Sequence, residues 1–390
     1  MKAERLVFAD ALRVAVIVFV IVHHAAQAYG PTGGEWTIHH RTVIEGMRAF
    51  YTVNAAFGLG LLFLLAGYFV PGSCERKGAR RFLKERLARI GMPLAVFTLG
   101  VHLPLVYLSR SRPPFGEFVH WLYQSGWLPL YWHLWFLGHL LLYSAAYAVW
   151  HWIARRQGPS KPLPVPGNAI ILGVAVALAL VTFMVRLRYP VDRWVPLFWV
   201  LAAEPAHLPQ YVSFFAVGAL AARGDWLRRL PTRVGLTWLS VGLLATAGAY
   251  VLSAVGRWDA VMAGGGHSIS SLARSAWEAL LALGLSVGLI VLFRELVRRP
   301  PRLLDGMARD SYAAYMLHLP VVVGLQAGAE RFDLPVGVLF ALVAVVAVLL
   351  AFGIGHLAGR TPGLRVILGM GPPRIRSEHE HDPGLSASKA

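Results

Sequence analysis

Arg13 and His24 stand eleven positions apart in the first apolar stretch of the chain. Eleven residues of an α-helix turn through about 1,100°, so both side chains would lie on one face, about 16 Å apart along the axis. His23 would point about 80° away from that face, which makes His24 the better candidate. Ionisable groups at membrane depth are costly and usually functional, and these two types suit proton transfer and anion binding. We therefore predict a functional polar seam that faces a protein interior or a wet cavity.

Two other interpretations of this stretch were weighed. Lys2 and Arg5 precede the apolar run, and Ala26-Gln-Ala28 resembles a cleavage site, as in a secretory signal peptide. Asp10 and Arg13 interrupt what would then be a clean apolar core, which disfavours a signal peptide. The same two residues could also form a structural ion pair beside an interfacial histidine, and this alternative stays open.

Composition predicts an all-α polytopic membrane protein. Of the 390 residues, 56% are hydrophobic and only 15% are charged, whereas charged residues make up about 25% of a typical soluble domain. The net charge of +17 falls in loops between apolar spans, so it indicates anionic lipid rather than nucleic acid as the partner. The single cysteine, Cys74, excludes an intrachain disulfide and a cysteine-rich metal site. We expect no bound metal.

Apolar stretches about 18 or more residues long recur along the chain and predict about ten transmembrane helices. Alternate loops hold most of the lysines and arginines, so the positive-inside rule predicts that both termini are cytoplasmic. Residues 1–358 would form the transmembrane domain, and residues 359–390 would form a cytoplasmic, disordered tail. The predicted helices span residues 7–29, 49–70, 90–108, 132–153, 169–187, 207–222, 235–255, 275–293, 311–329 and 335–357.

Further polar residues recur at helical spacing inside these spans. Ser311, Tyr315 and His318 lie at i, i+4 and i+7 and would form one polar stripe. A satisfied network of interhelical hydrogen bonds is the alternative to a functional role. In the fourth span, helical spacing would place Trp132, Phe136 and His139 on one face, where packing is the alternative to a binding wall. Arg274 and Glu278, at i and i+4, are expected to pair.

The basic segment 80–93 is amphipathic and includes Arg86 and Arg89. Such a helix commonly binds anionic lipid. Guanidinium groups also hold phosphates in bidentate fashion, so the segment would equally suit a phosphate-bearing cytoplasmic ligand.

Six short motifs, spread over about residues 8–358, together resemble the acyltransferase-3 superfamily of integral membrane O-acyltransferases. Many members carry a Trp-Ser/Thr-Leu…Glu signature at the fourth helix, where this chain has Trp132-His133-Leu134 and no glutamate. That departure is similar to the branch containing the glucan succinyltransferases. The motifs are Arg13 with His24, Leu64-Leu-Ala-Gly67-Tyr68-Phe69, Phe82-Leu-Lys84-Glu-Arg86-Leu-Ala-Arg89 up to Pro93, His133-Leu-Trp135-Phe136-Leu137, Pro209-Gln210-Tyr211 with Phe215-Ala-Val-Gly218, and Ser311-Tyr312 through Tyr315 to His318 and Pro320.

The resemblance implies an acyl-CoA-dependent O-acyltransferase of the bacterial inner (plasma) membrane. It would move an acetyl or succinyl group from cytoplasmic acyl-CoA, its donor substrate, to a hydroxyl of a carbohydrate or other acceptor. His24 would be the general base, and the cationic residues Arg13, Arg86 and Arg89 would hold the donor. No tightly bound cofactor is expected, and a homo-oligomer is left open. The residues expected to line the substrate cavity are Ser311, Tyr315, His318, Trp135 and His139.

Two mechanistic and functional alternatives remain at this point. A covalent acyl-histidine intermediate would replace general-base catalysis. A transporter or flippase for a lipid-linked saccharide would also place polar residues at mid-membrane. The sequence shows no inverted repeat and no matching pair of broken helices, which disfavours the transporter.

Overall fold

The computed structural model is 78% helical and nearly all-α, and it describes residues 5–31, 36, 38–110, 113–154, 162–299 and 301–370. Short π-helical turns join α3, α4 and α5 into one nearly continuous helical run. The elements are α1 (Val7–Ala26), α2 (Met47–Lys77), α3 (Ala79–Arg86), α4 (Met92–Phe97), α5 (Leu103–Ser109), α6 (Phe115–Gln124), α7 (Trp135–Ala154), α8 (Asn168–Arg186), β1 (Val195–Leu197), β2 (Leu201–Ala203), α9 (Leu208–Gly224), α10 (Trp226–Arg229), α11 (Thr232–Ala254), α12 (Trp258–Val261), α13 (Ile269–Leu296), α14 (Arg302–Ala329), α15 (Val336–Arg360) and α16 (Pro362–Ile367).

Each of the ten ranges predicted as spans coincides with a helix or helical run. Within the described ranges, seven helical segments are long and apolar enough to cross a membrane. The three others are α7, α9 and α14; α9 has only 17 residues, and the polar stripe of α14 lowers its hydropathy. The count of ten spans and the cytoplasmic termini therefore stay predictions. The seven segments are Val7–Tyr29, Met47–Lys77, Ala79–Leu108, Asn168–Arg186, Thr232–Ala254, Ile269–Leu296 and Val336–Arg360.

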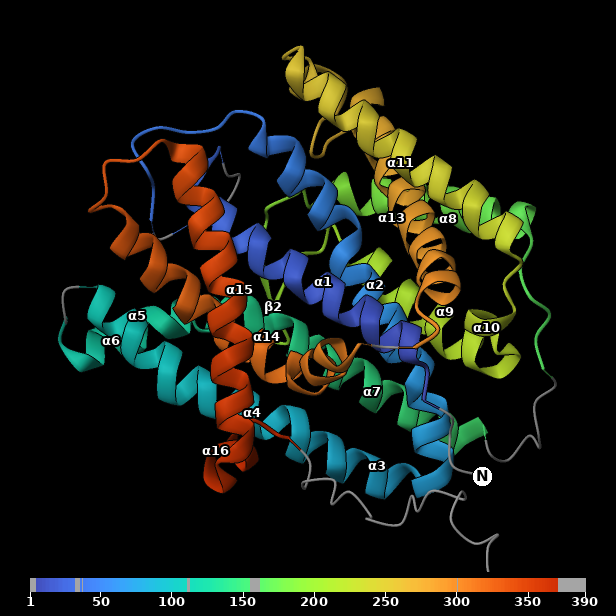
Figure 1. Cartoon of the computed structure of the whole chain (residues 1–390), viewed down its shortest axis with the longest axis horizontal. Helices are drawn as coiled ribbons and strands as arrows, with labels where there is room; N and C mark the ends of the chain where they lie inside the picture. Colours follow the sequence, from blue (N-terminus) through green and yellow to red (C-terminus); the bar gives the residue numbers. More distant parts are fainter. Residues whose placement is uncertain are drawn as a thin grey trace, which may run out of the picture.

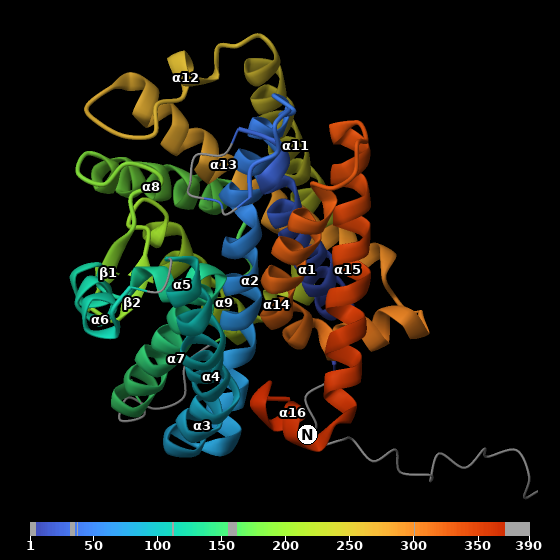
Figure 2. The same ribbon diagram turned by 90° about the vertical axis from the view of Figure 1, so that its left-hand side faces the viewer.

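Helix α2 lies near the middle of the bundle and contacts α1, α7, α9 and α13 (Figure 1). On one side of it, α1 packs against α14 and α15; on the other, α13 packs against α8 and α11. Figure 2 shows α3 and α16 at one end of the molecule and α12 at the opposite end. The helical part extends past residue 358 to Ile367, and the predicted tail beyond residue 370 lies outside the described residues.

A two-stranded hairpin that sequence reasoning did not predict connects α8 to α9. Strand β1 pairs with β2 in antiparallel fashion, with Val195 opposite Ala203 and Leu197 opposite Leu201. Phe198 and Trp199 make the turn with φ of 51° and 61°, the left-handed conformation that tight hairpin turns need. The hairpin places the buried residues Ala202 and Ala203 against the bundle.

Candidate active site

Arg13 is turned toward α14, as the predicted seam requires. Its Nε donates to Ser311 Oγ at 3.3 Å and its Nη2 donates to the Ala308 carbonyl at 3.0 Å. The same Nη2 lies 3.1 Å from Asp10 Oδ1, so the ion pair weighed as an alternative is also present. The Arg13 side chain is still 38% exposed, which leaves it accessible to an anionic ligand.

His24 faces α14 too, and two residues outside α1 fix the plane of its ring. The ring stacks on Trp36 with 5.5 Å between centroids and 13° between planes. Gln326 holds this pair together, because it accepts from Trp36 Nε1 at 2.9 Å and donates to the His24 carbonyl at 3.0 Å. The Nδ1 atom of His24 is buried and has no hydrogen-bond partner in the described part of the chain.

Two further histidines continue from His24. His318 on α14 lies 5.2 Å from His24 and 4.7 Å from His133, measured between ring centroids. His318 Nδ1 donates to the Tyr315 carbonyl at 2.6 Å, so its Nε2 carries the lone pair, and that atom has no partner among the described residues. The Tyr315 hydroxyl donates to the His133 carbonyl. Three histidines from α1, α14 and the 3₁₀ turn Trp132–Leu134 thus meet in one place.

A cavity of about 410 Å³ opens beside these histidines, a size that falls in the usual range for ligand pockets. No lysine or arginine belongs to its lining within the described residues. Its polar lining consists of His23, His24, Gln27, Asn54, His133, Asp192, Glu204 and His207. Its aromatic lining consists of Phe19, Trp36, Tyr51, Trp132, Trp135, Trp194, Tyr211 and Tyr315, with aliphatic residues of α1, α2 and α14.

Asp192, Glu204 and His207 form what we call the acidic end of the cavity. Glu204 Oε1 accepts from the Asp192 backbone N–H at 2.7 Å, and its Oε2 lies 2.9 Å from His207 Nδ1. Burial raises the pKa of Glu204, but the charge of His207 and its contact outweigh burial and leave the pKa below its usual value. Burial, followed by the charge of Glu204, raises the pKa of Asp192.

Behind the acidic end lies a buried ion-pair network. Glu278 pairs with Arg186, and its Oε1 accepts from Arg274 Nε at 3.0 Å. The Arg274–Glu278 pair confirms the sequence prediction, whereas Arg186, which is fully buried, was not predicted to join it. Both cations pair with Glu278, and neither forms an ion pair with Asp192 or Glu204 in the described part of the chain.

Several residues predicted to line the cavity lie elsewhere in the structure. The cavity lining includes His24, Tyr315 and Trp135 but not Arg13, Ser311, His318 or His139. His139 is fully buried, and its ring nitrogens contact the Tyr143 hydroxyl at 3.1 Å and the Ala202 carbonyl at 3.0 Å.

The helical face predicted for the fourth span does not form. Trp132 is in a 3₁₀ turn with φ of 41°, so helical spacing does not relate it to Phe136 and His139. Trp132 packs on His102 at 4.9 Å, Phe136 packs on Phe63 at 4.5 Å, and His139 contacts Tyr143.

The predicted donor residues Arg86 and Arg89 lie near the start of α14. The Arg89 carbonyl accepts from the Tyr312 hydroxyl at 3.0 Å, and the guanidinium carbon of Arg86 lies 5.1 Å from the centre of the Phe82 ring. Tyr312 directly follows Ser311, the residue that Arg13 contacts. Arg13 and the backbone of Arg89 therefore contact neighbouring residues of α14, Ser311 and Tyr312.

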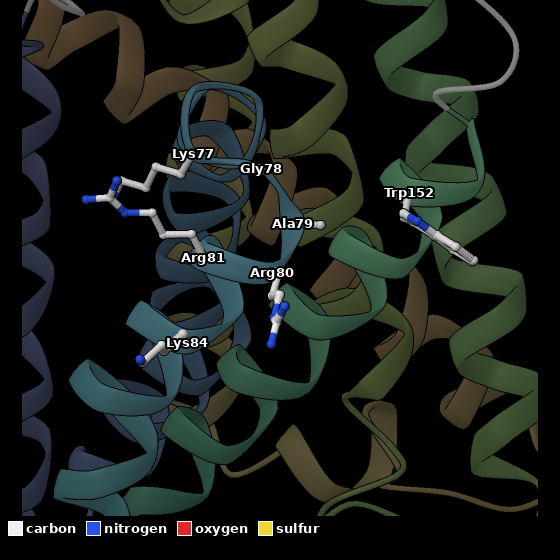
Figure 3. Close-up of a pocket in the computed structure, with 7 residues that line it drawn as sticks. All are labelled: Lys77, Gly78, Ala79, Arg80, Arg81, Lys84 and Trp152. Carbon is white, nitrogen blue, oxygen red and sulfur yellow. The ribbon is translucent and has the colours of Figure 1, made fainter.

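A separate basic hollow of about 590 Å³ lies at the corner between α2 and α3 (Figure 3). Its lining is Lys77, Gly78, Ala79, Arg80, Arg81, Lys84 and Trp152. Glu85 pairs with Lys77 and Arg81, whereas Arg80 and Lys84 have no ion-pair partner among the residues described. Sequence reasoning found this basic segment, but Arg86 and Arg89 are outside the lining of the hollow.

The sequence prediction of the site also missed His133, Trp36 and the acidic end. The only local signals were the position of His133 beside Trp135 and the presence of tryptophans with Glu204 in one external loop. Neither signal shows that these residues meet, because the contacts join segments far apart in the chain.

Comparison with known proteins gives one family and one group of relatives. A family model described as an acyltransferase domain matches residues 6–356. Proteins called glucans biosynthesis protein C from Salmonella paratyphi B, Salmonella dublin and Salmonella enteritidis are 27% identical over 237 residues, which is 56% of this chain. The match covers 59% of the length of these relatives. No solved structure matches significantly.

Proposed function

The chain belongs to the acyltransferase-3 family, and we propose that it moves an acyl group from acyl-CoA to a hydroxyl of a carbohydrate or other acceptor. Its apolar helices make it a multi-pass membrane protein, which we place in the bacterial inner (plasma) membrane. The observation that supports this proposal most is the meeting of His24, His318 and His133 beside one cavity. The name of the relatives, glucans biosynthesis protein C, supports a carbohydrate acceptor.

In the proposed reaction neutral His24 is the general base. The acceptor oxygen attacks the thioester carbonyl carbon while a ring nitrogen of His24 takes the hydroxyl proton. The tetrahedral intermediate then collapses, the bond from carbon to sulfur breaks, and the CoA thiolate leaves with the proton that His24 returns. His24 suits this role because it lines the cavity and its Nδ1 has no partner within the described chain. Trp36 holds the ring in one plane.

His318 and Tyr315 hold the neighbouring histidines in position. The Tyr315 carbonyl fixes the Nδ1–H tautomer of His318, so the His318 Nε2 lone pair remains to accept from a neighbouring group. We assign His318 as a positioning residue, because it contacts His24 and His133 without lining the cavity. The Tyr315 hydroxyl fixes the 3₁₀ turn that carries His133.

We propose that Arg13, Arg86 and Arg89 receive the anionic donor. Guanidinium groups match phosphate geometry, and Arg13 and the Arg89 backbone contact the neighbouring residues Ser311 and Tyr312 of α14. The acyl end would reach His24 along the seam between α1 and α14, where Arg13 contacts Ser311 and His24 contacts His318.

The test uses the full chain purified in detergent, with acetyl-CoA or succinyl-CoA as donor and a glucose oligosaccharide as acceptor. We expect acceptor-dependent release of CoA thiol and a matching mass increase of the saccharide. Absence of thioester consumption and of acyl-CoA binding would contradict the proposal and favour the transporter. Rapid-quench labelling with radioactive acyl-CoA and no acceptor separates the two chemical routes, because only a covalent acyl-histidine leaves the label on the protein.

Replacing Arg13 with alanine should mainly raise the KM for acyl-CoA. A hydrogen bond to a charged group contributes about 1.5–3 kcal/mol, so we expect a rise of about 10- to 100-fold with a much smaller change in kcat. Steady-state kinetics with varied acyl-CoA measure both constants. The matched control is Arg5→Ala, because Arg5 also pairs with Asp10 but meets α14 at Asp305 in its first turn rather than at Ser311. A lower kcat with unchanged KM would exclude Arg13 from donor binding.

A further inference from the structure

The acidic end of the cavity contains a carboxylate, Asp192, that has no hydrogen-bond donor or cation paired with it in the described chain. Asp192 has no side-chain hydrogen bond or ion pair within the described residues, although its backbone N–H is held by Glu204. Glu204 is 9% exposed and lines the same cavity. An anionic oxygen in a partly closed site gains from a hydrogen-bond donor, so this end is suited to a ligand that donates.

His133 points to a ligand independently of the two carboxylates. It is only 5% exposed, and both of its ring nitrogens lack a partner in the described chain. Buried polar atoms are nearly always satisfied, and unsatisfied ones in a native protein call for an explanation. Because His133 lines the cavity, a bound ligand with hydroxyl groups would satisfy these nitrogens.

The walls between His133 and the carboxylates are aromatic. Trp135 and Trp194 meet edge to face with 5.5 Å between ring centroids, and Tyr211 lies 5.4 Å from Trp135. Trp194 is 39% exposed, so part of its ring remains uncovered. A ring-shaped ligand with apolar faces and a polar edge matches such a surface, since apolar walls with a few placed polar groups fix orientation.

The charge of the lining decides which ligands are excluded. The described lining contains Asp192 and Glu204 but no lysine or arginine, and the nearby cations Arg186 and Arg274 are held by Glu278. His207 also lines the cavity and pairs with Glu204, so Asp192 is the carboxylate of this end without an ion pair in the described chain. An anionic ligand would bring a like charge next to Asp192, which is how binding sites reject wrong partners.

We propose that the acidic end of the cavity is the acceptor subsite and that it selects uncharged saccharides over acidic ones. Hydroxyls of the sugar donate to Asp192 and Glu204, its faces pack on Trp135 and Trp194, and His133 contacts the hydroxyl nearest to His24. This inference rests on the proposed acyltransferase function and adds the charge class of the acceptor to it.

The test measures saccharide binding to the detergent-purified full chain by tryptophan fluorescence. The two probes are a tetrasaccharide of glucose and a tetrasaccharide of glucuronic acid. We expect the neutral probe to bind at least about tenfold more tightly, because the acidic probe meets the Asp192 carboxylate, which has no ion-pair partner in the described chain. Equal binding, tighter binding of the acidic probe, or binding of neither would overturn the proposal.

Asp192→Asn makes the test specific to this residue. Asp192 has φ of 67°, and asparagine tolerates this conformation as well as aspartate does, so the variant is expected to fold. Loss of one charge-assisted hydrogen bond should weaken binding of the neutral probe about fivefold. The acidic probe should bind more tightly, so the ratio of the two affinities should decrease. The matched control is Asp259→Asn, since Asp259 is 80% exposed and pairs with Arg48 outside the cavity. An unchanged ratio in Asp192→Asn would overturn the assignment.

Failure of this inference is distinguishable from failure of the proposed function. Thioester consumption without preference for the neutral saccharide would contradict the proposed acceptor subsite but not the proposed acyltransferase activity. Neutral saccharide binding without any acyl-CoA consumption would instead support the saccharide subsite and contradict the acyltransferase activity.

Discussion

His24→Ala is expected to lower kcat by about 10²–10⁴, the usual contribution of a general base. The loss follows from the proposed chemistry, in which His24 takes the proton of the attacking hydroxyl and returns it to the leaving thiolate. Initial rates of CoA release at saturating acyl-CoA and acceptor measure the effect. The KM for acyl-CoA should change little, because Arg13 and not His24 contacts the predicted donor side.

Two variants separate loss of the base from loss of structure. His24→Ala leaves a gap between Trp36 and His318, whereas His24→Gln fills that space with a side chain that cannot act as a base at neutral pH. Both should be equally inactive if the base matters. His23→Ala is the matched control, because His23 lines the same cavity but its Nε2 already contacts Gln27 at 3.1 Å. Near-normal activity of His24→Gln would assign the base elsewhere.

The three histidines also explain why the base should be His24 rather than His318. His318 is fully buried and outside the cavity lining, so an acceptor hydroxyl cannot reach it without displacing its neighbours. His133 also lines the cavity, but it lies in the 3₁₀ turn Trp132–Leu134 and not on the helix that carries Arg13. His23 and His24 both line the cavity from the helix that carries Arg13, but of these two it is His24 that stacks on Trp36 and contacts His318.

Sequence periodicity predicted the parts of this site that depend on one helix. The eleven-residue spacing placed Arg13 and His24 on one face, and the structure turns both toward α14. Hydropathy located each long helix of the described chain, because an apolar stretch is a local signal. Its bounds were less accurate: α14 begins at Arg302 rather than 311, and α2 ends at Lys77 rather than 70. The i, i+4 spacing likewise predicted the pair Arg274–Glu278.

Contacts between distant segments could not be predicted in this way. Tyr315 and His133 are 182 positions apart, and Arg186 and Glu278 are 92 positions apart. Their meeting depends on how α7, α8, α13 and α14 pack, which single-helix periodicity does not encode. Trp132 leaves the helical pattern through its positive φ, and α7 begins three residues later at Trp135.

Glycine residues in two of the recognised motifs predict the largest effect on folding. Gly67 on α2 and Gly218 on α9 let the two helices cross in backbone contact. A Cβ at Gly67 would overlap the Phe215 carbonyl, and one at Gly218 would overlap the Leu64 carbonyl. Such close crossings are typical of helix pairs in membranes. Gly67→Ala and Gly218→Ala should each destabilise the protein by about 3 kcal/mol, the upper end for overpacking, because backbone cannot move aside as a side chain can.

The matched control for this crossing is Gly58→Ala on the same helix. A Cβ at Gly58 meets only a Val16 methyl at 4.0 Å, which is an ordinary contact. Gly58→Ala therefore makes the same change of residue type in α2 without an overlap with backbone. Thermal unfolding followed by size-exclusion chromatography in detergent should show early loss of the monodisperse peak for Gly67→Ala and not for Gly58→Ala. Equal stability of the two variants would mean that α2 and α9 are not in backbone contact. Because α9 follows directly after the acidic end and α2 lines the cavity, the cavity would then have a different geometry.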